Sequence, residues 1–368
     1  MADSNPLVSI CIPAFNSGAF IHRALMSCIN QTYQNIEIVV GDNASTDNTL
    51  EIIKEYAGKD SRIKFFQNKS NIGSGNNYLE CAKHASGHFM QALGSDDWLS
   101  RNYVEEGVRS FLSNPEAASV FSNMVTLEIL PPLPPRFLSE GIIKSDKYPM
   151  EWFFRKAYSH PYLGSMGYQS FMRRGDFIKA MEKAMSNPVN FLDRGERREP
   201  IDSTIFWEVL INYEYIVVTN KSAVILSAHG KDHVGLQGDF FESKEGFIYY
   251  ALAVRRAYEA FYSKSEKLKT YVKKLRFSFG LGVIGSVVSF VLKEKKFRFL
   301  DWKKKIVALN NIFFEDYSLG GKCLVLLSAP HYFLFKLLKR RLVRLISKQH
   351  PFVPTSNHFL TEELMFKI

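Results

Sequence analysis

The chain has 368 residues, of which 46% are hydrophobic and 23% charged, so it is long enough to bury a sizeable core and is not a disordered protein. Its four cysteines have no regular spacing, which argues against a disulfide framework or a zinc site and favours a reducing compartment. The first apolar run, Leu7 to Pro13, is too short for a secretory signal and lacks a basic flank.

Strand and helix patterns alternate along the first hundred residues. Short apolar runs predict buried strands at 8–12, 36–40, 63–67 and 88–93. Apolar residues at helical spacing predict helices near 20–29, 50–56 and 78–82. This order predicts a doubly wound α/β sheet of parallel strands with right-handed crossovers. Further along, the patterns predict helices at 152–158 and 204–210 and strands at 165–172 and 215–219.

Polar residues follow the carboxyl ends of the predicted strands, where open α/β sheets bind ligands. Asp96 and Asp97 are adjacent carboxylates whose repulsion needs a cation or hydrogen bonds, and Mg²⁺ and Mn²⁺ prefer such oxygen ligands. The alternative is a solvated turn with a helix cap at Asp97. Asp42 is placed to accept the ring N–H of uracil or thymine, and its alternative role is an Asx turn or helix cap.

Several ordered motifs resemble family 2 glycosyltransferases. They are Val8–Asn16, Gln31–Tyr33, Asp42–Asp47, Asn71–Gly73, Asn77, Ala85–Gly87 and Ser95–Asp97. The resemblance is dense over residues 7–110 and thins out towards residue 235. It implies a GT-A (Rossmann-like) fold, a nucleotide-sugar donor bound through Mn²⁺ or Mg²⁺, and transfer of the sugar with inversion.

The resemblance also implies roles for single residues. The residues implied in nucleotide-sugar binding are Pro13, Ala14, Asn16, Asp42, Asn76 and Asp96. Within this set, Asp42 would contact the base and Asp96 the ribose or donor sugar, while Asp97 would bind the metal. Two positions depart from the family pattern, because Asn76 stands where many relatives have Arg and Gly94 where many have Asp.

An inverting transfer needs a base that takes the proton of the acceptor hydroxyl. Asp202 matches the acidic residue that serves as this base in the family, with Glu199 in reserve, and its alternative role is a helix N-cap. His229 stands about where relatives carry a histidine near the metal and diphosphate, so the resemblance implies a metal ligand there. Its alternative is an ordinary loop residue.

The net charge of +10 is concentrated towards the end of the chain. Residues 264–348 hold 20 Lys and Arg against 5 Asp and Glu, around apolar runs at 277–292 and 323–335. Both runs are shorter than the ~20 residues that a spanning helix needs. Apolar stripes bordered by cations predict attachment to an anionic membrane surface, and the alternative is a helical subdomain with solvated charges. No nucleic-acid-binding module is recognisable, so we expect no nucleic-acid partner.

Together these observations predict three regions. Residues 1–117 would form the nucleotide-sugar-binding half of a GT-A domain, 118–235 its acceptor-binding half, and 236–368 a helical, basic, membrane-associating region. The predicted function is an inverting, metal-dependent hexosyltransferase. We expect it to move a sugar from a UDP-linked nucleotide-sugar to a glycan or lipid-linked acceptor in surface polysaccharide assembly. We expect a cytoplasmic protein, peripheral on the inner face of the cell membrane.

Two other functions remain open. The first is a non-catalytic, membrane-associated glycan-binding or scaffolding protein with a decayed site. The second is a sugar-phosphate nucleotidyltransferase, which would have a Gly-rich, basic loop after the first strand. The segment Ala14 to Gly18 lacks both the glycines and the basic residue of such a loop, which disfavours this alternative.

Overall fold

The computed structural model describes residues 4–128, 136–137, 144–153, 170–186, 208–228, 255, 259, 263, 272–273, 276–277, 280–281, 314 and 317–325. The chain divides into two compact units. The first comprises 1–191, 200–236 and 358–368 and contains the sheet. The second comprises 192–199 and 237–357 and contains the short described pieces from residue 255 onward.

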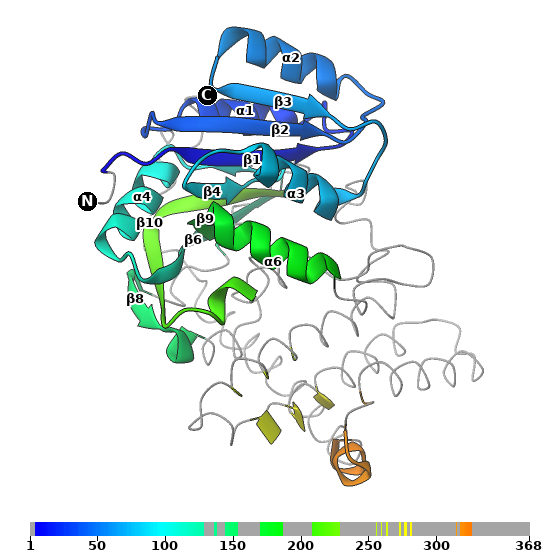
Figure 1. Ribbon diagram of the computed structural model, residues 1–368, viewed down its shortest axis with the longest axis vertical. Helices are drawn as coiled ribbons and strands as arrows, with labels where there is room; N and C mark the ends of the chain where they lie inside the picture. Colours follow the sequence, from blue (N-terminus) through cyan, green and yellow to red (C-terminus); the bar gives the residue numbers. More distant parts are fainter. Residues whose placement is uncertain are drawn as a thin grey trace, which may run out of the picture. The chain divides into compact units, whose positions relative to one another are not determined.

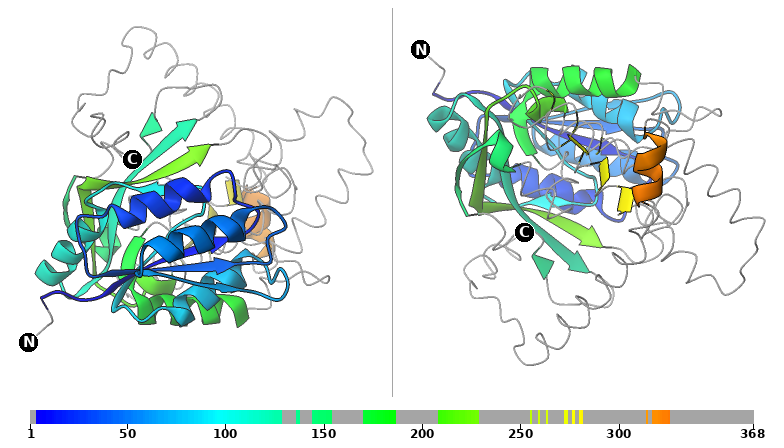
Figure 2. Two further views of the ribbon diagram at one scale, coloured as in Figure 1. Left: turned by 90° about the horizontal axis from the view of Figure 1, so that it is seen from above. Right: turned by 90° about the horizontal axis from the view of Figure 1, so that it is seen from below.

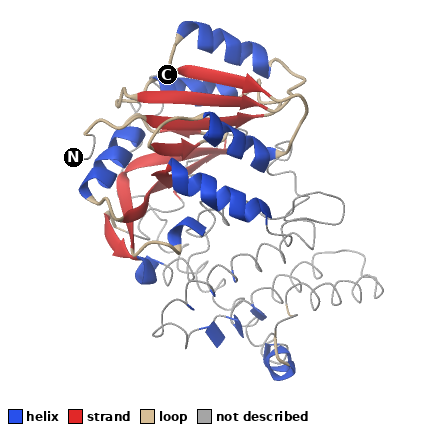
Figure 3. Ribbon diagram, viewed as in Figure 1, coloured by secondary structure: helices blue, strands red, loops and turns tan. Residues whose placement is uncertain are grey.

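The first unit is built on one sheet, in which ten strands are described (Figures 1 and 3). The strands are β1 (Val8–Ala14), β2 (Ile36–Asp42), β3 (Ile63–Gln67), β4 (Phe89–Ala92), β5 (Trp98–Leu99), β6 (Ala117–Glu128), β7 (Arg136–Phe137), β8 (Asp146–Pro149), β9 (Ser170–Arg173) and β10 (Tyr215–Ala228). Eight of them follow the order β3-β2-β1-β4-β9-β6-β10-β5, with β7 on β6 and β8 on β10. The first four strands are parallel, and β9 runs antiparallel to both of its neighbours.

Helices cover both faces of this sheet, and Figure 2 shows α1 and α6 on opposite sides of it. The helices are α1 (Ile21–Ile29), α2 (Thr49–Lys59), α3 (Ser74–His84), α4 (Tyr103–Ser113) and α6 (Arg174–Ser186). Apolar residues of α1, α2 and α4 form one buried cluster with alternate residues of β1 and β2. Those of α3 and α6 form a second cluster with Cys11, Val39 and Met90, which point to the other face. Burial on both faces explains why β1 and β2 are mostly apolar.

The predicted mostly parallel α/β fold is confirmed, and the first four strands and three helices lie where the sequence patterns put them. Strand β10 is longer than predicted and continues to Ala228, while α4 has no counterpart among the predicted elements. Large parts of the helices and the strand predicted over 152–210 lie outside the described residues. The division at 117/118 and 235/236 stays a prediction, although strands from both sides of residue 117 share the sheet.

The described pieces of the second unit meet at an ion pair. Arg276 donates from Nε and Nη2 to the two carboxylate oxygens of Glu259, at 2.9 and 3.1 Å. The Tyr317 hydroxyl donates to the carbonyl oxygen of Arg276 at 2.6 Å, and the buried Arg255 guanidinium lies 5.2 Å from the Tyr317 ring. Most of the predicted helical, basic region lies outside the described residues. In the part of the chain that the structure describes, no helix has the length and apolar character to cross a bilayer.

Candidate functional site

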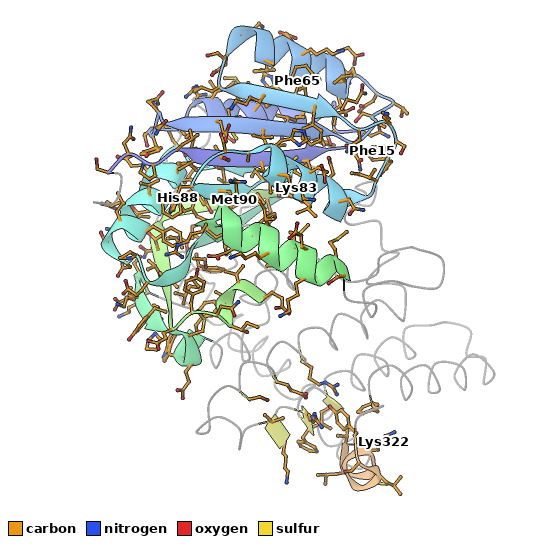
Figure 4. All side chains as sticks on the ribbon, viewed as in Figure 1. Phe15, Phe65, Lys83, His88, Met90 and Lys322 are labelled. Atoms are coloured by element: carbon orange, nitrogen blue, oxygen red, sulfur yellow. The ribbon has the colours of Figure 1, made fainter. Side chains whose placement is uncertain are left out.

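A cavity of about 490 Å³ lies in the first unit, where β1, β2 and β4 end. Its lining residues are Pro13, Ala14, Phe15, Asn16, Ser17, Phe20, Asn43, Asn71, Gly73, Ser74, Asn77, Tyr78, Gly94, Ser95 and Asp96. Figure 4 shows Phe15 at the arrowhead end of β1, whereas His88, just before β4, lies at the opposite edge of the sheet. The cavity therefore opens at the carboxyl ends of the parallel strands, where α/β sheets bind their ligands.

The loops after β1 and β2 are held together by Asn16. Its Oδ1 accepts a hydrogen bond from the backbone N–H of Thr46 at 2.8 Å, and its own N–H donates to Oγ of Ser45 at 3.0 Å. Asn16 has a φ of 48° and Ala44 a φ of 60°, a left-handed conformation in which non-glycine residues are uncommon. The side chain of Asn16 thus fixes the cavity rim by joining two loops.

Ser17 joins the same rim to the loop after β4. Its hydroxyl lies 2.6 Å from that of Ser95, and its backbone N–H donates to Oγ1 of Thr49 at 2.7 Å. The next residue is Gly18, where a Cβ atom would come within 2.0 Å of Oδ1 of Asn48, so only glycine fits there without rearrangement. Three loops that are far apart in the sequence are therefore held in one arrangement around the cavity.

Asp42 is the last residue of β2 and is completely buried. Its Oδ2 accepts hydrogen bonds from Nε2 of Gln67 at 2.9 Å and from the backbone N–H of Ser45 at 3.3 Å. Its Oδ1 is also buried and has no hydrogen-bond partner among the described residues. An unsatisfied buried carboxylate oxygen is costly, which makes it a ready acceptor for a ligand's N–H. Asp42 does not itself line the cavity, whereas the adjoining Asn43 does.

The carboxylates of Asp96 and Asp97 both fold back over Gly94. A Cβ atom on Gly94 would lie 2.8 Å from Oδ1 of Asp96 and 2.7 Å from Oδ2 of Asp97, so the absence of a side chain leaves room for both oxygens. Both aspartates are half-buried, and Asp96 lines the cavity. Two converging carboxylates suit a cation such as Mg²⁺ or Mn²⁺. The described residues contain no group of three or more metal-binding His, Cys, Asp or Glu side chains.

The structure brings together several of the residues that the sequence analysis assigns to the site. Four of the implied nucleotide-sugar-binding residues line the cavity, namely Pro13, Ala14, Asn16 and Asp96. Asn76 does not: it is exposed on the first turn of α3, and its Nδ2 donates to the carbonyl oxygen of Ile72 at 2.7 Å. Asp202 and His229 lie outside the described residues, so their predicted roles stay predictions.

Other cavity residues carry no assigned role in the sequence analysis. Phe15 presents a ring that is 38% exposed, and Tyr78 lines the cavity from α3. Asn43, Asn71 and Asn77 form much of the wall between β2 and α3. All three asparagines stand inside the motifs that carry the family resemblance. Their place in those motifs is the signal that could have identified them.

A parallel sheet with the order β3-β2-β1-β4 and a cavity at its carboxyl edge is the arrangement in which open α/β sheets bind their ligands. Residues 9–166 match the sequence model of Glycosyl transferase family 2. The motifs on which the resemblance rests fall almost entirely within this matched region.

Two relatives are each similar to about a third of the chain. An uncharacterized glycosyltransferase of Haemophilus influenzae is 35% identical over 109 residues, which are 30% of this chain and 44% of the relative. The chondroitin synthase of Pasteurella multocida is 36% identical over 117 residues, which are 32% of this chain and 12% of the synthase. The chain thus spans less than half of the length of either relative.

Solved structures resemble a larger part of the chain. Residues 1–349 of TarS from S. aureus, in complex with UDP, match with a TM-score of 0.61 at 17% identity, covering 94% of this chain and 92% of the TarS chain. A longer TarS structure matches with a TM-score of 0.59 at 18% identity and covers 86% of this chain and 50% of that one. These similarities support the GT-A fold.

Proposed function

We propose that this protein is an inverting glycosyltransferase that moves a sugar from a UDP-linked donor to a glycan or lipid-linked acceptor in surface polysaccharide assembly. The observation that carries the proposal is the cavity at the ends of β1, β2 and β4, which joins the surroundings of Asp42 to the carboxylate of Asp96. The family of residues 9–166 and the UDP bound to TarS give further support.

The nucleoside half of the donor would occupy the cavity beside Asn43. Uracil carries a ring N–H, which is the donor that the unsatisfied Oδ1 of Asp42 requires. Pro13, Ala14 and Asn16 would contact the nucleoside from the β1 side. Because Asp42 Oδ1 is covered in this structure, we expect a small movement of its surroundings when the base binds.

The diphosphate would lie towards α3. Gly73 and Ser74, at the beginning of this helix, line the cavity, and the first turn contains no acidic residue. The amino end of a helix carries a partial positive charge, which favours a phosphate group. Many relatives have an arginine where this chain has Asn76, and the partial charge of the helix would compensate in part for that lost positive charge. The side chain of Asn76 is exposed, so we assign it only to the outer part of the donor site.

Asp97 would hold a divalent metal ion, Mn²⁺ or Mg²⁺, with Asp96 beside it towards the ribose or donor sugar. The ion would supply positive charge that neutralises the departing diphosphate. Gly94 leaves room for both carboxylates, so together they would hold this charge beside the cavity. His229 is proposed as a further metal ligand, and Asp202 as the base that takes the proton from the acceptor hydroxyl.

The region 236–368 would attach the enzyme to the inner face of the cell membrane, with its Lys and Arg residues on anionic head groups. Its surplus of positive charge between residues 264 and 348 motivates this part of the proposal. Flotation with vesicles of anionic and of neutral lipid tests it. We expect the full chain to float with the anionic vesicles only, and failure to float with either would refute membrane attachment.

The transferase proposal is tested by measuring UDP release from UDP-sugars in the presence of Mn²⁺. We expect wild-type protein to release UDP, and Asp97→Ala to lose at least about a hundredfold in kcat, the loss typical of one electrostatic contact to the departing group. Asp146→Ala, an exposed residue on β8, is the matched control and should retain full activity. Equal activity of Asp97→Ala and wild type would contradict the metal assignment. No release from any UDP-, GDP- or dTDP-sugar would favour the non-catalytic alternative.

A further inference from the structure

Four asparagine side chains form a continuous hydrogen-bond network beside the cavity. Nδ2 of Asn77 donates to the carbonyl oxygen of Gly41 at 2.7 Å, which attaches the first turns of α3 to the end of β2. Nδ2 of Asn68 donates to Oδ1 of Asn77 at 3.0 Å and to Oδ1 of Asn43 at 3.1 Å. Nδ2 of Asn43 in turn donates to Oδ1 of Asn71 at 2.8 Å.

The same amides hold the backbone between β3 and α3. Oδ1 of Asn43 accepts from the N–H of Ile72 at 3.0 Å, and Oδ1 of Asn71 accepts from the N–H of Gly73 at 2.9 Å. The N–H of Asn68 donates to the carbonyl oxygen of Asp42 at 2.8 Å. The loop 68–73 is thus held against the end of β2 at several points, although it contains no regular secondary structure.

The network holds the residues of the cavity wall in place. Asn43 and Asn77 are only 2% and 1% exposed, and both line the cavity together with Asn71. Asn68 does not line it and reaches the cavity wall only through the two side chains to which it donates. Both hydrogens of the Asn68 amide are used in these bonds, so Asn68 is the node that joins the β2 side of the wall to α3.

We propose that this asparagine network is a positioning device that pre-forms the wall of the donor site, with Asn68 as its central donor. The inference rests on the proposed function, because it takes the ligand to be a nucleoside diphosphate. A loop that is already ordered does not have to be ordered by the ligand, so the network increases affinity without contacting the reacting atoms. Asn68 is therefore a positioning residue for donor binding.

The substitution Asn68→Asp tests this role because it keeps the shape of the side chain and replaces its NH₂ by an oxygen. That oxygen would face the Oδ1 atoms of Asn43 and Asn77, which changes two attractions into repulsions. We expect the Kd for UDP and the KM for a UDP-sugar to rise about 30-fold, which corresponds to about 2 kcal/mol. The kcat at saturating donor should stay within about twofold of the wild-type value. The substitution weakens binding of the substrate and of the transition state equally, so the chemical step does not change.

Two further variants keep the result interpretable. Asn35→Asp is the matched control, because its Nδ2 donates to the carbonyl oxygen of Asn5 at 2.6 Å, before β2 and away from the cavity. Its Kd for UDP should equal that of the wild type. Asn68→Ala removes both bonds without adding a charge, and we expect its Kd to rise about fivefold, the effect of losing hydrogen bonds between neutral groups.

The outcomes separate this inference from the proposed function. If wild-type protein binds no nucleoside diphosphate, the proposed function fails and the positioning role fails with it. If wild type binds UDP but Asn68→Asp and Asn68→Ala bind it equally well, only the positioning role is overturned. The positioning role is also overturned if either variant lowers kcat by the same factor by which it raises KM. A third contrary result is a general loss of stability, in which the Tm without nucleotide falls further than in Asn35→Asp and the loss of UDP affinity is only proportional to that fall in Tm.

Discussion

Replacement of Glu37 tests how the motif Ala85–Gly87 is held in the fold. Glu37 lies on β2, its side chain is 4% exposed, and its Oε1 accepts hydrogen bonds from Oγ of Ser9 and the N–H of Ser86, both at 2.6 Å, and from the N–H of Gly87 at 3.0 Å. Nζ of Lys64 lies 2.7 Å from Oε2. The carboxylate of Glu37 therefore fixes the α3–β4 loop.

These contacts set the sign and size of the effect. Burial alone would raise the pKa of Glu37, but the hydrogen bonds from Lys64, Ser9 and Ser86 outweigh it and lower the pKa from 4.5 to about 2. The difference corresponds to about 3 kcal/mol of folding free energy. Because the pKa is lower in the folded state, this stability is fully present above pH 4.5 and is lost as the pH falls towards 2.

The variant Glu37→Gln has the same shape but lacks the charge and one acceptor. We expect its free energy of unfolding, measured with urea at pH 7, to be lower than that of the wild type by about 3 kcal/mol. At pH 3 the difference should shrink by more than half. Lys64→Met is the control, and it should cost less than about 1 kcal/mol because the lysine side chain is 58% exposed. A difference between Glu37→Gln and wild type that stays constant from pH 7 to pH 3 would refute this reasoning.

Two glycines give opposite predictions in the same unfolding assay. A Cβ atom on Gly41 would come within 2.6 Å of the Phe66 ring and 2.7 Å of Sγ of Cys81, so Gly41→Ala should destabilise the protein by about 1–3 kcal/mol. Gly58 lies in α2 with nothing within 4 Å of such an atom, so Gly58→Ala should stabilise it by about 0.5–1 kcal/mol. An unchanged Gly41→Ala would show that α3 does not pack tightly on β2, and a destabilised Gly58→Ala would show that α2 is not helical there.

The sequence was sufficient for the fold of the first hundred residues because strand and helix periodicities alternate there without interruption. It also located the edge at which Asn16, Asp42 and Asp96 gather, since parallel strands end on the same side of a sheet. This follows from topology alone and does not require any side-chain contact to be known.

Contacts between loops could not be predicted in this way. Whether Glu37 is buried depends on the N–H groups of Ser86 and Gly87, about fifty residues further along the chain. The role of Asn68 likewise depends on Asn43 and Asn77, which belong to other elements. Such pairs have no periodicity, so the sequence names the residues but not their partners. The outward direction of Asn76 could not be predicted for a different reason. Its Nδ2 donates to the carbonyl oxygen of Ile72, and the sequence does not determine whether a side chain in the first helical turn makes such a local bond or points into the cavity.

The central claim is that the carboxylate at the end of β2 binds a nucleotide in the cavity, and calorimetric titration with UDP tests it most directly. We expect wild-type protein to bind UDP at one site per chain. Asp42→Asn should bind it at least about tenfold more weakly, because an amide in place of the carboxylate gives up a charge-assisted bond to the base. Absence of UDP binding by the wild type, or equal binding by Asp42→Asn, would contradict the account.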